Sequence, residues 1–274
     1  MRLHTRMVFT PTGPAHLGHA YMASVNRRLA LNTGGSFLYR FETEQARMSG
    51  VIAGVDLRHG RVQQAVENYE DMQYLGLEQA NTEQYSPSWG ENFEITKWQY
   101  RNLGMEECFG PWPTPYYKEM GYNPDALSFA TGFQHPFLTL SHVVEDLYSG
   151  RNCIVRGPEL ERERDLYLYL TYRITRRKDT LPIVCSIPAV HRLVNNQKPR
   201  LSSSMPKETG NMTVQALIQA GRTAEEFWSW FDKRVFTTDW SIYWCSPEEV
   251  LRYIRQPLLI VQEVWDKFLE DGQP

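Results

Sequence analysis

The stretch Thr5-Arg-Met-Val-Phe-Thr-Pro-Thr-Gly-Pro-Ala-His-Leu-Gly-His19 decides the fold. It predicts a buried strand at residues 7–9, a Pro/Gly turn, and a helix from about residue 16 to residue 32. This order places free backbone N–H groups and the positive end of a helix dipole where a phosphate can bind. Gly18 allows a flat adenine ring to approach the backbone closely. His16 and His19 lie three residues apart, so both imidazoles can reach a phosphate chain from one helical face. By itself, the pattern is also typical of a polar helix cap.

Composition limits the classes of protein that the chain can belong to. Its 274 residues are 42% hydrophobic and 13% aromatic, enough for one large domain and a small one. No apolar run approaches the ~18 residues of a membrane span, so we expect a cytoplasmic protein with no membrane partner. The four cysteines are widely spaced without a C-x-x-C pair, which argues against a structural zinc site and a disulfide framework. The net charge of −3 lacks the basic excess of a protein that grips long nucleic acid.

Hydrophobic periodicity predicts the remaining elements. Strands are expected at 36–42, 152–157 and 181–189, and helices at 62–74, 90–101 and 159–174. In the helix at 62–74 an apolar stripe is predicted to be core: Val62, Ala65, Val66, Tyr69 and Met72. The polar segment 195–210 is either a surface linker or a mobile phosphate-binding lid. After it the chain is expected to be helical, with capping boxes at Thr223 and Ser246 and an apolar stripe of Val261, Val264, Trp265 and Phe268 in the last helix.

Four segments in chain order carry a resemblance to a known family. Residues 6–19 look like the signature R-F-A-P-S-P-T-G-x-L-H-I-G, and residues 34–47 are similar to G-G-x-F-x-L-R-I-E-D-x-D-x-x-R. Residues 143–157 resemble V-V-D-D-x-x-x-G-x-x-x-V-I-R-G, and Lys198-Pro-Arg-Leu-Ser-Ser-Ser204 occupies the place of a K-M-S-K-S loop. These are signatures of the catalytic domain of class I glutamyl-tRNA synthetases and of their short paralogues, the glutamyl-Q tRNA(Asp) synthetases. The resemblance implies an α/β fold: a Rossmann-like, doubly wound parallel sheet with a short connective insertion and a small C-terminal helical region.

The resemblance also implies a reaction and a set of site residues. The reaction is ATP-dependent activation of an amino acid as aminoacyl-AMP, with Mg²⁺ as cofactor and no metal ligand assigned in the protein. The implied catalytic residues, which contact the phosphates or close over the pyrophosphate, are His16, His19, Arg200, Ser202, Ser203, Ser204 and Lys207. The other ATP-binding residues are Thr12, Gly13, Gly18, Glu159 and Leu201, and the amino-acid-binding residues are Arg6, Thr10, Glu42, Leu138, His142 and Arg156. Either Lys198 or Lys207 takes the place of the second lysine of the K-M-S-K-S loop, where Ser203 stands.

Departures from the family pattern bear on the substrate and the acceptor. Leu138 stands where the family has a tyrosine and His142 where it has a small or amide side chain, so the amino acid is glutamate or a related one. We expect an adenylating domain at 1–205, with a connective insertion at about 78–137 that is shorter than the family's, and a helical region at 206–274. No anticodon-binding domain is expected. A small acceptor (an amine, a nucleoside or a carrier protein) is therefore favoured over two alternatives: a divergent glutamyl-Q-type enzyme acting on tRNA, and a non-catalytic binding paralogue.

Overall fold

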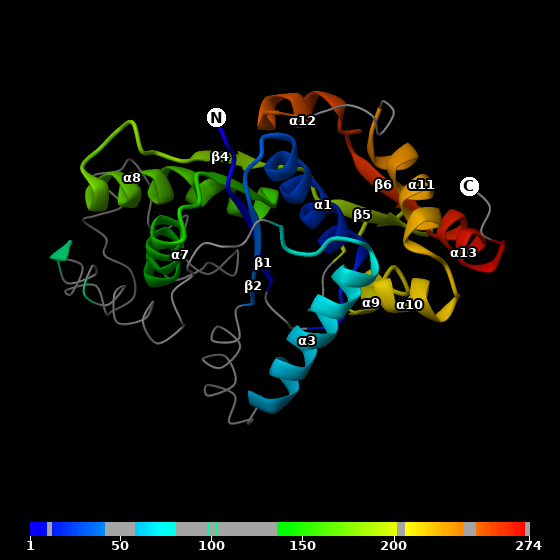
Figure 1. The fold of residues 1–274 in the computed structure, drawn as a ribbon. Helices are drawn as coiled ribbons and strands as arrows, with labels where there is room; N and C mark the ends of the chain where they lie inside the picture. Colours follow the sequence, from blue (N-terminus) through cyan, green and yellow to red (C-terminus); the bar gives the residue numbers. More distant parts are fainter. Residues whose placement is uncertain are drawn as a thin grey trace. The chain divides into compact units, whose positions relative to one another are not determined.

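A computed structural model of the chain describes residues 1–9, 13–41, 58–80, 98, 102–103, 136–201, 206–237 and 245–271. The chain divides into two compact units, one made of Met1–Thr82, Cys153–Glu159 and Val184–Pro274, the other of Glu83–Asn152 and Leu160–Ile183 (Figure 1). The helix predicted at 90–101 lies outside the described residues except for Trp98, and so does most of the connective insertion. The predicted boundary at residues 205 and 206 stays a prediction.

A parallel sheet is the centre of the first unit. It contains β1 (Thr5–Phe9), β2 (Phe37–Phe41), β3 (Cys153–Arg156) and β4 (Ile183–Ser186), in the order β2-β1-β3-β4. β1 pairs in parallel with β2 over its whole length, from Thr5 opposite Phe37 to Phe9 opposite Phe41, and with β3 at Thr5 and Cys153. The predicted α/β fold with a parallel sheet is confirmed. The strands at 7–9, 36–42 and 152–157 are all present, with bounds shifted by one or two residues.

Helix α1 (Leu17–Asn32) joins β1 to β2 and packs on the sheet. Its predicted apolar face, Leu17, Ala20, Tyr21 and Val25, is fully buried. The helix ends where Gly34 adopts a positive φ of 67° and the Gly35 N–H donates to the Ala30 carbonyl (2.8 Å). A Cβ on Gly35 would lie 1.9 Å from the Leu3 carbonyl oxygen, so only glycine allows the chain to turn here into β2.

Helix α3 (Arg58–Tyr74) begins four residues before the predicted start and presents a different face to the core. Ala65 and Met72 are buried as predicted, but Val66 is 46% exposed, so its assignment to the core is wrong. Two polar residues of α3 are buried instead, Asn68 at 0% and Asp71 at 1% exposure. The face is rotated because the surface that α3 covers offers hydrogen-bonding groups, to which these side chains are joined.

The strand predicted at 181–189 is shorter than expected, since only β4 lies in that range, and a strand of a second sheet, β5, follows it. β4 ends at Ser186, and β5 (Val190–Leu193) begins after Pro188, which has no N–H to donate to a continuing ladder. β5 pairs in parallel with β6 (Leu258–Val261), a strand that the sequence did not predict. β6 runs directly into α13 (Gln262–Asp271), and Val261, predicted to belong to the last helix, is the final residue of β6. In α13 Trp265 and Phe268 are buried as predicted, whereas Val264 is 37% exposed.

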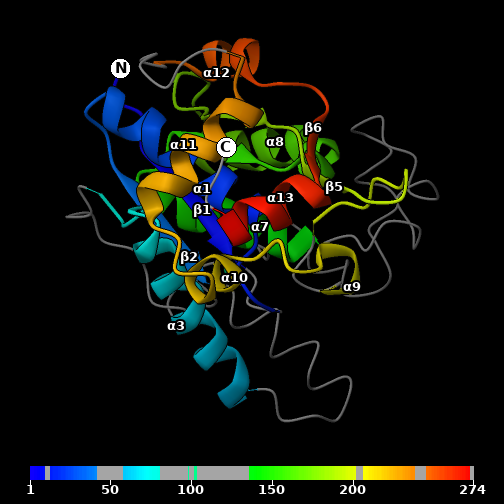
Figure 2. The ribbon, with the colours of Figure 1, turned by 90° about the vertical axis from the view of Figure 1, so that its right-hand side faces the viewer.

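The C-terminal region carries the remaining helices of the first unit: α9 (Pro206–Thr209), α10 (Val214–Gln219), α11 (Ala224–Val235) and α12 (Pro247–Tyr253). Both predicted capping boxes are present, at Thr223 with Glu226 and at Ser246 with Glu249. An aromatic cluster fills the space between α11 and α13 and contains Phe227, Trp230, Phe231, Trp265 and Phe268. Figure 2 shows α11 and α13 together on the same side of the unit.

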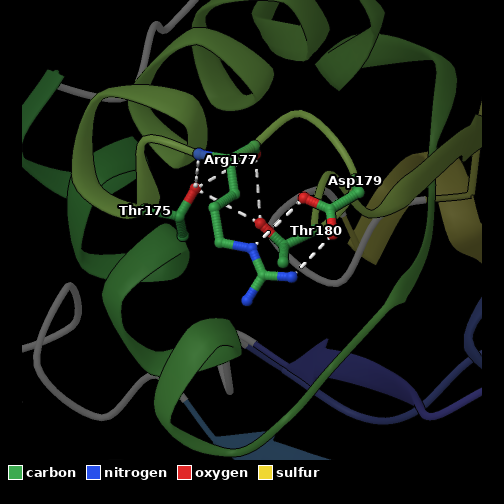
Figure 3. A network of polar contacts seen from close by, with 4 residues as sticks. All are labelled: Thr175, Arg177, Asp179 and Thr180. Carbon is green, nitrogen blue, oxygen red and sulfur yellow. Dashed lines mark hydrogen bonds and ion pairs between the residues drawn. The ribbon is translucent and has the colours of Figure 1, made fainter.

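The second unit has α7 (Pro136–Tyr148) and α8 (Arg164–Thr175), which pack on each other. The predicted helix at 159–174 begins as the 3-10 helix η2 (Pro158–Glu163). Buried bonds tie α8 to α7: the Tyr167 hydroxyl donates to Asp146 (2.6 Å). After α8 the chain turns through Arg176 at a positive φ of 57°, and an exposed network of Thr175, Arg177, Asp179 and Thr180 holds the turn (Figure 3). No helix in the described ranges is long and apolar enough to cross a bilayer.

A buried ion pair joins α1 to α11. Arg28 Nη2 lies 3.2 and 3.3 Å from the two carboxylate oxygens of Asp232, and the two side chains are only 14% and 6% exposed. The guanidinium also lies over the rings of Trp228 and Phe236, at 5.8 and 5.2 Å from their centroids. Burial raises the pKa of Asp232 to about 7 against the attraction of Arg28. Helix α11 is thus attached to α1 by a buried ion pair, in which the Arg28 charge is stabilised by the Asp232 carboxylate.

We predict that Asp232→Asn lowers the free energy of unfolding by about 3–5 kcal/mol at pH 8, because it leaves the Arg28 charge buried without its carboxylate. Urea unfolding followed by circular dichroism measures this. The matched control is Glu78→Gln, since Glu78 pairs at 3.8 Å with the neighbouring Arg27 of α1 in an exposed setting. That loss should be about 0–1 kcal/mol. Equal losses in the two variants would contradict the assignment of a buried, structural ion pair.

Candidate nucleotide site at the start of helix α1

The first turn of α1 is capped by its own two histidines. His16 is the N-cap residue, with extended backbone, and its Nδ1 accepts from the Gly18 N–H (3.1 Å). His19 Nδ1 accepts in turn from the His16 N–H (3.2 Å), so the two form a reciprocal capping box. The imidazole rings are stacked, with centroids 3.7 Å apart and planes 18° apart. Two predictions from the sequence pattern are therefore confirmed: the histidines form a polar helix cap, and their rings lie on one face of the helix.

Both imidazoles are held in the neutral form. Burial, followed by the charge of Arg200, lowers the pKa of His16 to about 3. Burial, His16 and Arg200 also lower the pKa of His19 well below its usual range. In each ring Nδ1 accepts a backbone N–H, so the ring proton of the neutral form is on Nε2. The cap thus places two neutral imidazoles, each with its ring proton on Nε2, at the positive end of a helix dipole, a combination suited to phosphate oxygens.

Gly18 is required by the capping geometry. A Cβ built on Gly18 would lie 2.9 Å from both Cε1 and Nδ1 of His16, which is closer than such atoms approach. The same position is 3.9 Å from Cβ of Leu201, a residue that is 3% exposed. Gly18 therefore lets the His16 ring fold over the helix start, whereas Leu201 would be in ordinary van der Waals contact with a side chain at this position. The predicted approach of adenine to Gly18 stays a prediction.

A second chain segment is paired with the helix start. The Leu17 N–H donates to the Met212 carbonyl (3.1 Å), and the Val214 N–H donates to the Ala15 carbonyl (2.9 Å). This bridge places His16 opposite Thr213, whose side chain caps α10. The backbone on either side of His16 is therefore fixed from outside α1.

The polar segment predicted as a linker or lid begins as a hairpin attached to β5. Asn195 and Asn196 form its turn with positive φ angles of 48° and 61°, and Val194 and Gln197 exchange backbone hydrogen bonds. The returning strand pairs through the Leu201 N–H and the Val190 carbonyl (3.1 Å). It carries Arg200, which is exposed and whose charge acts on both histidines. Ser202, Ser203 and Ser204 lie outside the described residues, so their predicted role is untested.

Arg192 of β5 holds the far side of that loop. Its Nη2 donates to the Lys207 carbonyl (3.2 Å) and its Nη1 to the Gln262 side chain (3.4 Å). Gly210, at a positive φ of 61°, leaves room for the guanidinium, since a Cβ there would lie 1.9 Å from Nη1. Lys207 lies in α9 and is exposed. Of the two lysines that could replace the missing loop lysine, it is the one whose backbone is bonded to Arg192. Lys198 lies in the hairpin itself, where its carbonyl is bonded to His191.

The amino-acid candidates are only partly described. Arg6 in β1 and Arg156 at the end of β3 are buried, at 6% and 7% exposure. Thr10 and Glu42 lie outside the described residues, but the strands they follow end level with each other, since Phe9 pairs with Phe41. Leu138 and the buried His142 belong to α7 of the second unit, so their part in this pocket stays a prediction.

The candidate ATP-binding residues are also only partly described. Gly13 is described and its carbonyl accepts from Asn68 of α3 (3.3 Å), whereas Thr12 lies outside the described residues. Glu159 lies in η2, but its side chain is not described. Sequence reasoning missed Asn68, Asp71 and Arg192. The first two carried a signal, because they are polar residues at helical spacing on a helix that must bury one face.

The family described as "tRNA synthetases class I (E and Q), catalytic domain" matches residues 2–53. The predicted resemblance to this family is confirmed. The matched segment contains the first two of the four motifs, and with them the strand, turn and capped helix of the candidate site.

The similar proteins match this chain over different shares of its length. The glutamyl-Q tRNA(Asp) synthetase of Rhodobacter capsulatus is 33% identical over 73 residues, which are 27% of this chain and 22% of that protein. A glutamate tRNA ligase structure from Elizabethkingia meningosepticum aligns over 93% of this chain and 65% of its own, with a TM-score of 0.57 and 13% identity. A tyrosyl-tRNA synthetase structure from Aeropyrum pernix covers 99% and 78%, with a TM-score of 0.50 and 14% identity. At such identities the structural likeness shows the fold.

The neutral histidines make stability depend on pH in a defined direction. Because the folded-state pKa of His16 lies below 6.5, the unfolded state takes up the proton first, and stability falls as the pH drops below about 6.5. We predict that His16→Asn, which keeps an N-cap acceptor but cannot titrate there, loses less melting temperature than wild type between pH 8 and pH 5. Differential scanning fluorimetry measures both slopes. Parallel slopes would show that His16 does not titrate from a buried, neutral state.

Proposed function

We propose that the protein activates an amino acid, glutamate or a related one, with ATP. The substrate carboxylate attacks the α-phosphorus and forms the acyl–phosphate bond of aminoacyl-AMP. The bond from that phosphorus to the oxygen bridging the α- and β-phosphates breaks, and pyrophosphate leaves with the bonding electrons. The comparisons support this proposal, since the matched relatives bear the names of synthetases and of a tRNA ligase.

One observation carries the proposal: the two stacked, neutral histidines at the start of α1. Negative charge grows on the α-phosphate and on the leaving pyrophosphate during the reaction. Donors that are already in place and need no reorganisation stabilise this charge more than they stabilise bound ATP. Neutral imidazoles supply Nε2–H donors without the repulsion that two stacked imidazolium ions would create, so the lowered pKa values support the assigned role.

Cationic and hydroxyl groups from the loop after β5 would complete the phosphate contacts. Arg200 is anchored by the hairpin and its charge already reaches both histidines. Lys207 is tied through its backbone to Arg192, which leaves its ammonium group to reach the pyrophosphate. Ser202, Ser203 and Ser204 would add hydroxyl donors. In the amino-acid pocket, Arg6 and Arg156 would bind carboxylates, and Glu42 and Thr10 would hold the α-ammonium group.

Magnesium would arrive with the nucleotide. Within the described ranges, no cluster of three or more His, Cys, Asp or Glu side chains is placed to hold a metal ion. Mg²⁺ commonly binds substrate phosphates and waters with few protein ligands. Its contribution when bound is to neutralise phosphate charge, and the residues above would act on the oxygens that it leaves uncovered.

The acceptor is the second part of the proposal. The net charge of −3 and the short connective insertion favour a small acceptor, because a tRNA held by many phosphates needs a Lys or Arg for each. A tRNA acceptor is the second candidate, favoured by the name of the Rhodobacter relative. A non-catalytic paralogue is the third, and the intact His16, Gly18 and His19 argue against it because a binding module does not need donors for a transition state.

An ATP–pyrophosphate exchange assay over a panel of amino acids tests the activation step. We expect exchange with glutamate or a close analogue. No exchange with any amino acid, with and without tRNA, would overturn the enzymatic proposals and leave the binding paralogue. Where exchange occurs, labelled amino acid in acid-precipitable RNA identifies tRNA as acceptor, and a soluble amide or ester identifies a small one.

We predict that His19→Ala slows exchange by about 10²–10³-fold, the usual loss when one preorganised donor is removed from a developing negative charge. The variant should still fold, since His19 is half-buried and contributes one capping bond. The measurement is kcat/KM for exchange together with a melting curve. Exchange within threefold of wild type would mean that the site is misassigned.

We predict that Gly18→Ala separates stability from activity. The new methyl group pushes the His16 ring away, which removes a cap worth about 1 kcal/mol. Replacing glycine by alanine inside a helix returns about 1 kcal/mol, so the melting temperature should change little. Exchange should fall at least tenfold, because His16 no longer points its Nε2–H at the phosphates. Unchanged exchange together with an unchanged melting temperature would show that the ring position is not important.

A further inference from the structure

A polar stripe on α3 faces the turn that precedes α1. Gln64, Asn68 and Asp71 follow one another at spacings of four and three residues, so they share one side of the helix. Asn68 is 0% and Asp71 1% exposed. Burial of an amide and a carboxyl group is costly unless each makes hydrogen bonds, so their partners indicate what the stripe does.

Asn68 binds the turn directly. Its Nδ2 donates to the Gly13 carbonyl (3.3 Å), and its Oδ1 accepts from Gln64 Nε2 (3.2 Å), which fixes the orientation of the amide. Gly13 belongs to the turn that leads from β1 to His16. A bond from α3 thus fixes the backbone three residues before the N-cap of α1.

Asp71 reaches the other side of the same turn through α10. Its Oδ1 accepts from Gln215 Nε2 of α10. The residue before Gln215 is Val214, whose N–H donates to the Ala15 carbonyl. The far end of α3 is attached nearby, since the Leu75 carbonyl accepts from Trp228 Nε1 (2.8 Å) and the Tyr74 hydroxyl donates to the Arg222 carbonyl. In Figure 1 the C-terminal end of α3 accordingly lies beside α10.

We propose that Asn68 and Asp71 are positioning residues of the nucleotide site, which clamp the segment Gly13–Leu17 at two points: Asn68 at the Gly13 carbonyl, and Asp71 through Gln215 at the pairing of Ala15 with Val214. The proposal rests on the proposed function in that the clamped segment carries His16. Neither residue contacts the phosphates. Their effect is on where the two imidazoles and the first N–H groups of α1 point.

The clamp has a titratable member. Burial raises the pKa of Asp71 to about 6, with Glu67 and Glu70 of its own helix adding to the rise and the Gln215 bond opposing it. The α10 residues that pack here include no charged side chain, since α10 reads Val-Gln-Ala-Leu-Ile-Gln. Oδ2 of Asp71 is buried, and within the described residues no hydrogen-bond donor reaches it. The ionised carboxylate is the stronger acceptor for Gln215, so the clamp is tighter above pH 6 than below it.

The first test compares two amides of α3. Asn68→Leu removes the donor to Gly13 and keeps the number and branching of the side-chain heavy atoms. Gln63→Leu is the matched control, because Gln63 is exposed and its amide donates to Glu67 of the same helix (3.1 Å). We expect the Kd for ATP, measured by calorimetry, to rise at least tenfold in Asn68→Leu and to stay within twofold of wild type in Gln63→Leu. A Kd within twofold in both variants overturns the proposal.

The second test uses Asp71→Asn, which keeps an oxygen acceptor for Gln215 but does not titrate, and it decides the matter if Asn68→Leu does not fold. ATP phosphates titrate in the same range, so the quantity compared is the ratio of the wild-type to the variant Kd. We expect this ratio to fall as the pH rises from 5 to 7.5, with a midpoint near 6. A constant ratio overturns the role of Asp71. If the wild type binds ATP with these responses but shows no pyrophosphate exchange, the proposed function fails while the clamp stands.

Discussion

The structure depends on how the first backbone N–H groups of α1 are satisfied. A helix that starts at the edge of a buried sheet presents donors that must find acceptors. Here a ring nitrogen of each of two histidines supplies one, which fixes the rings against each other and against the helix. Those bonds determine the tautomer, and burial determines the charge. The absence of a side chain at Gly18, the packing of Leu201 and the pairing of residues 15–17 with 212–214 all follow from accommodating this arrangement.

Much of the sheet and of its first crossover could be predicted from the sequence, because these features depend on local pattern. The apolar run before Thr10, the buried face of α1 and the stop at Gly34 each have a signal within a few residues. The capping boxes at Thr223 and Ser246 likewise need only side chains three residues apart. His16 and His19 are likewise a local feature, since they lie three residues apart. Their spacing predicts a shared face, although the ring stacking depends on side-chain rotation that no spacing encodes.

The features that were missed depend on partners far away in the chain. β6 is a strand because β5 offers it a ladder, and its four residues alone cannot be told from the beginning of an amphipathic helix. Asn68 and Asp71 are buried where Val66 was expected to be. The polar face is buried because the turn supplies an acceptor for Asn68 and α10 supplies a donor for Asp71. Pattern reasoning assumes that a buried face is apolar, and this assumption fails where one element is fixed to another by hydrogen bonds.

The pairing of β5 with β6 has a consequence for the order of folding. The hairpin that carries Arg200 extends from β5, and its anchor Arg192 bonds to a residue 70 positions later in the chain. Contacts of such separation are formed late, since a long loop must close before they contribute. During synthesis, β1 and β2 can therefore pair while the hairpin after β5 still lacks the support of β6 and Gln262. The hairpin that carries Arg200 is fixed in place only when β6 and α13 have emerged from the ribosome, so a shorter nascent chain would carry the histidines without that hairpin in its final position.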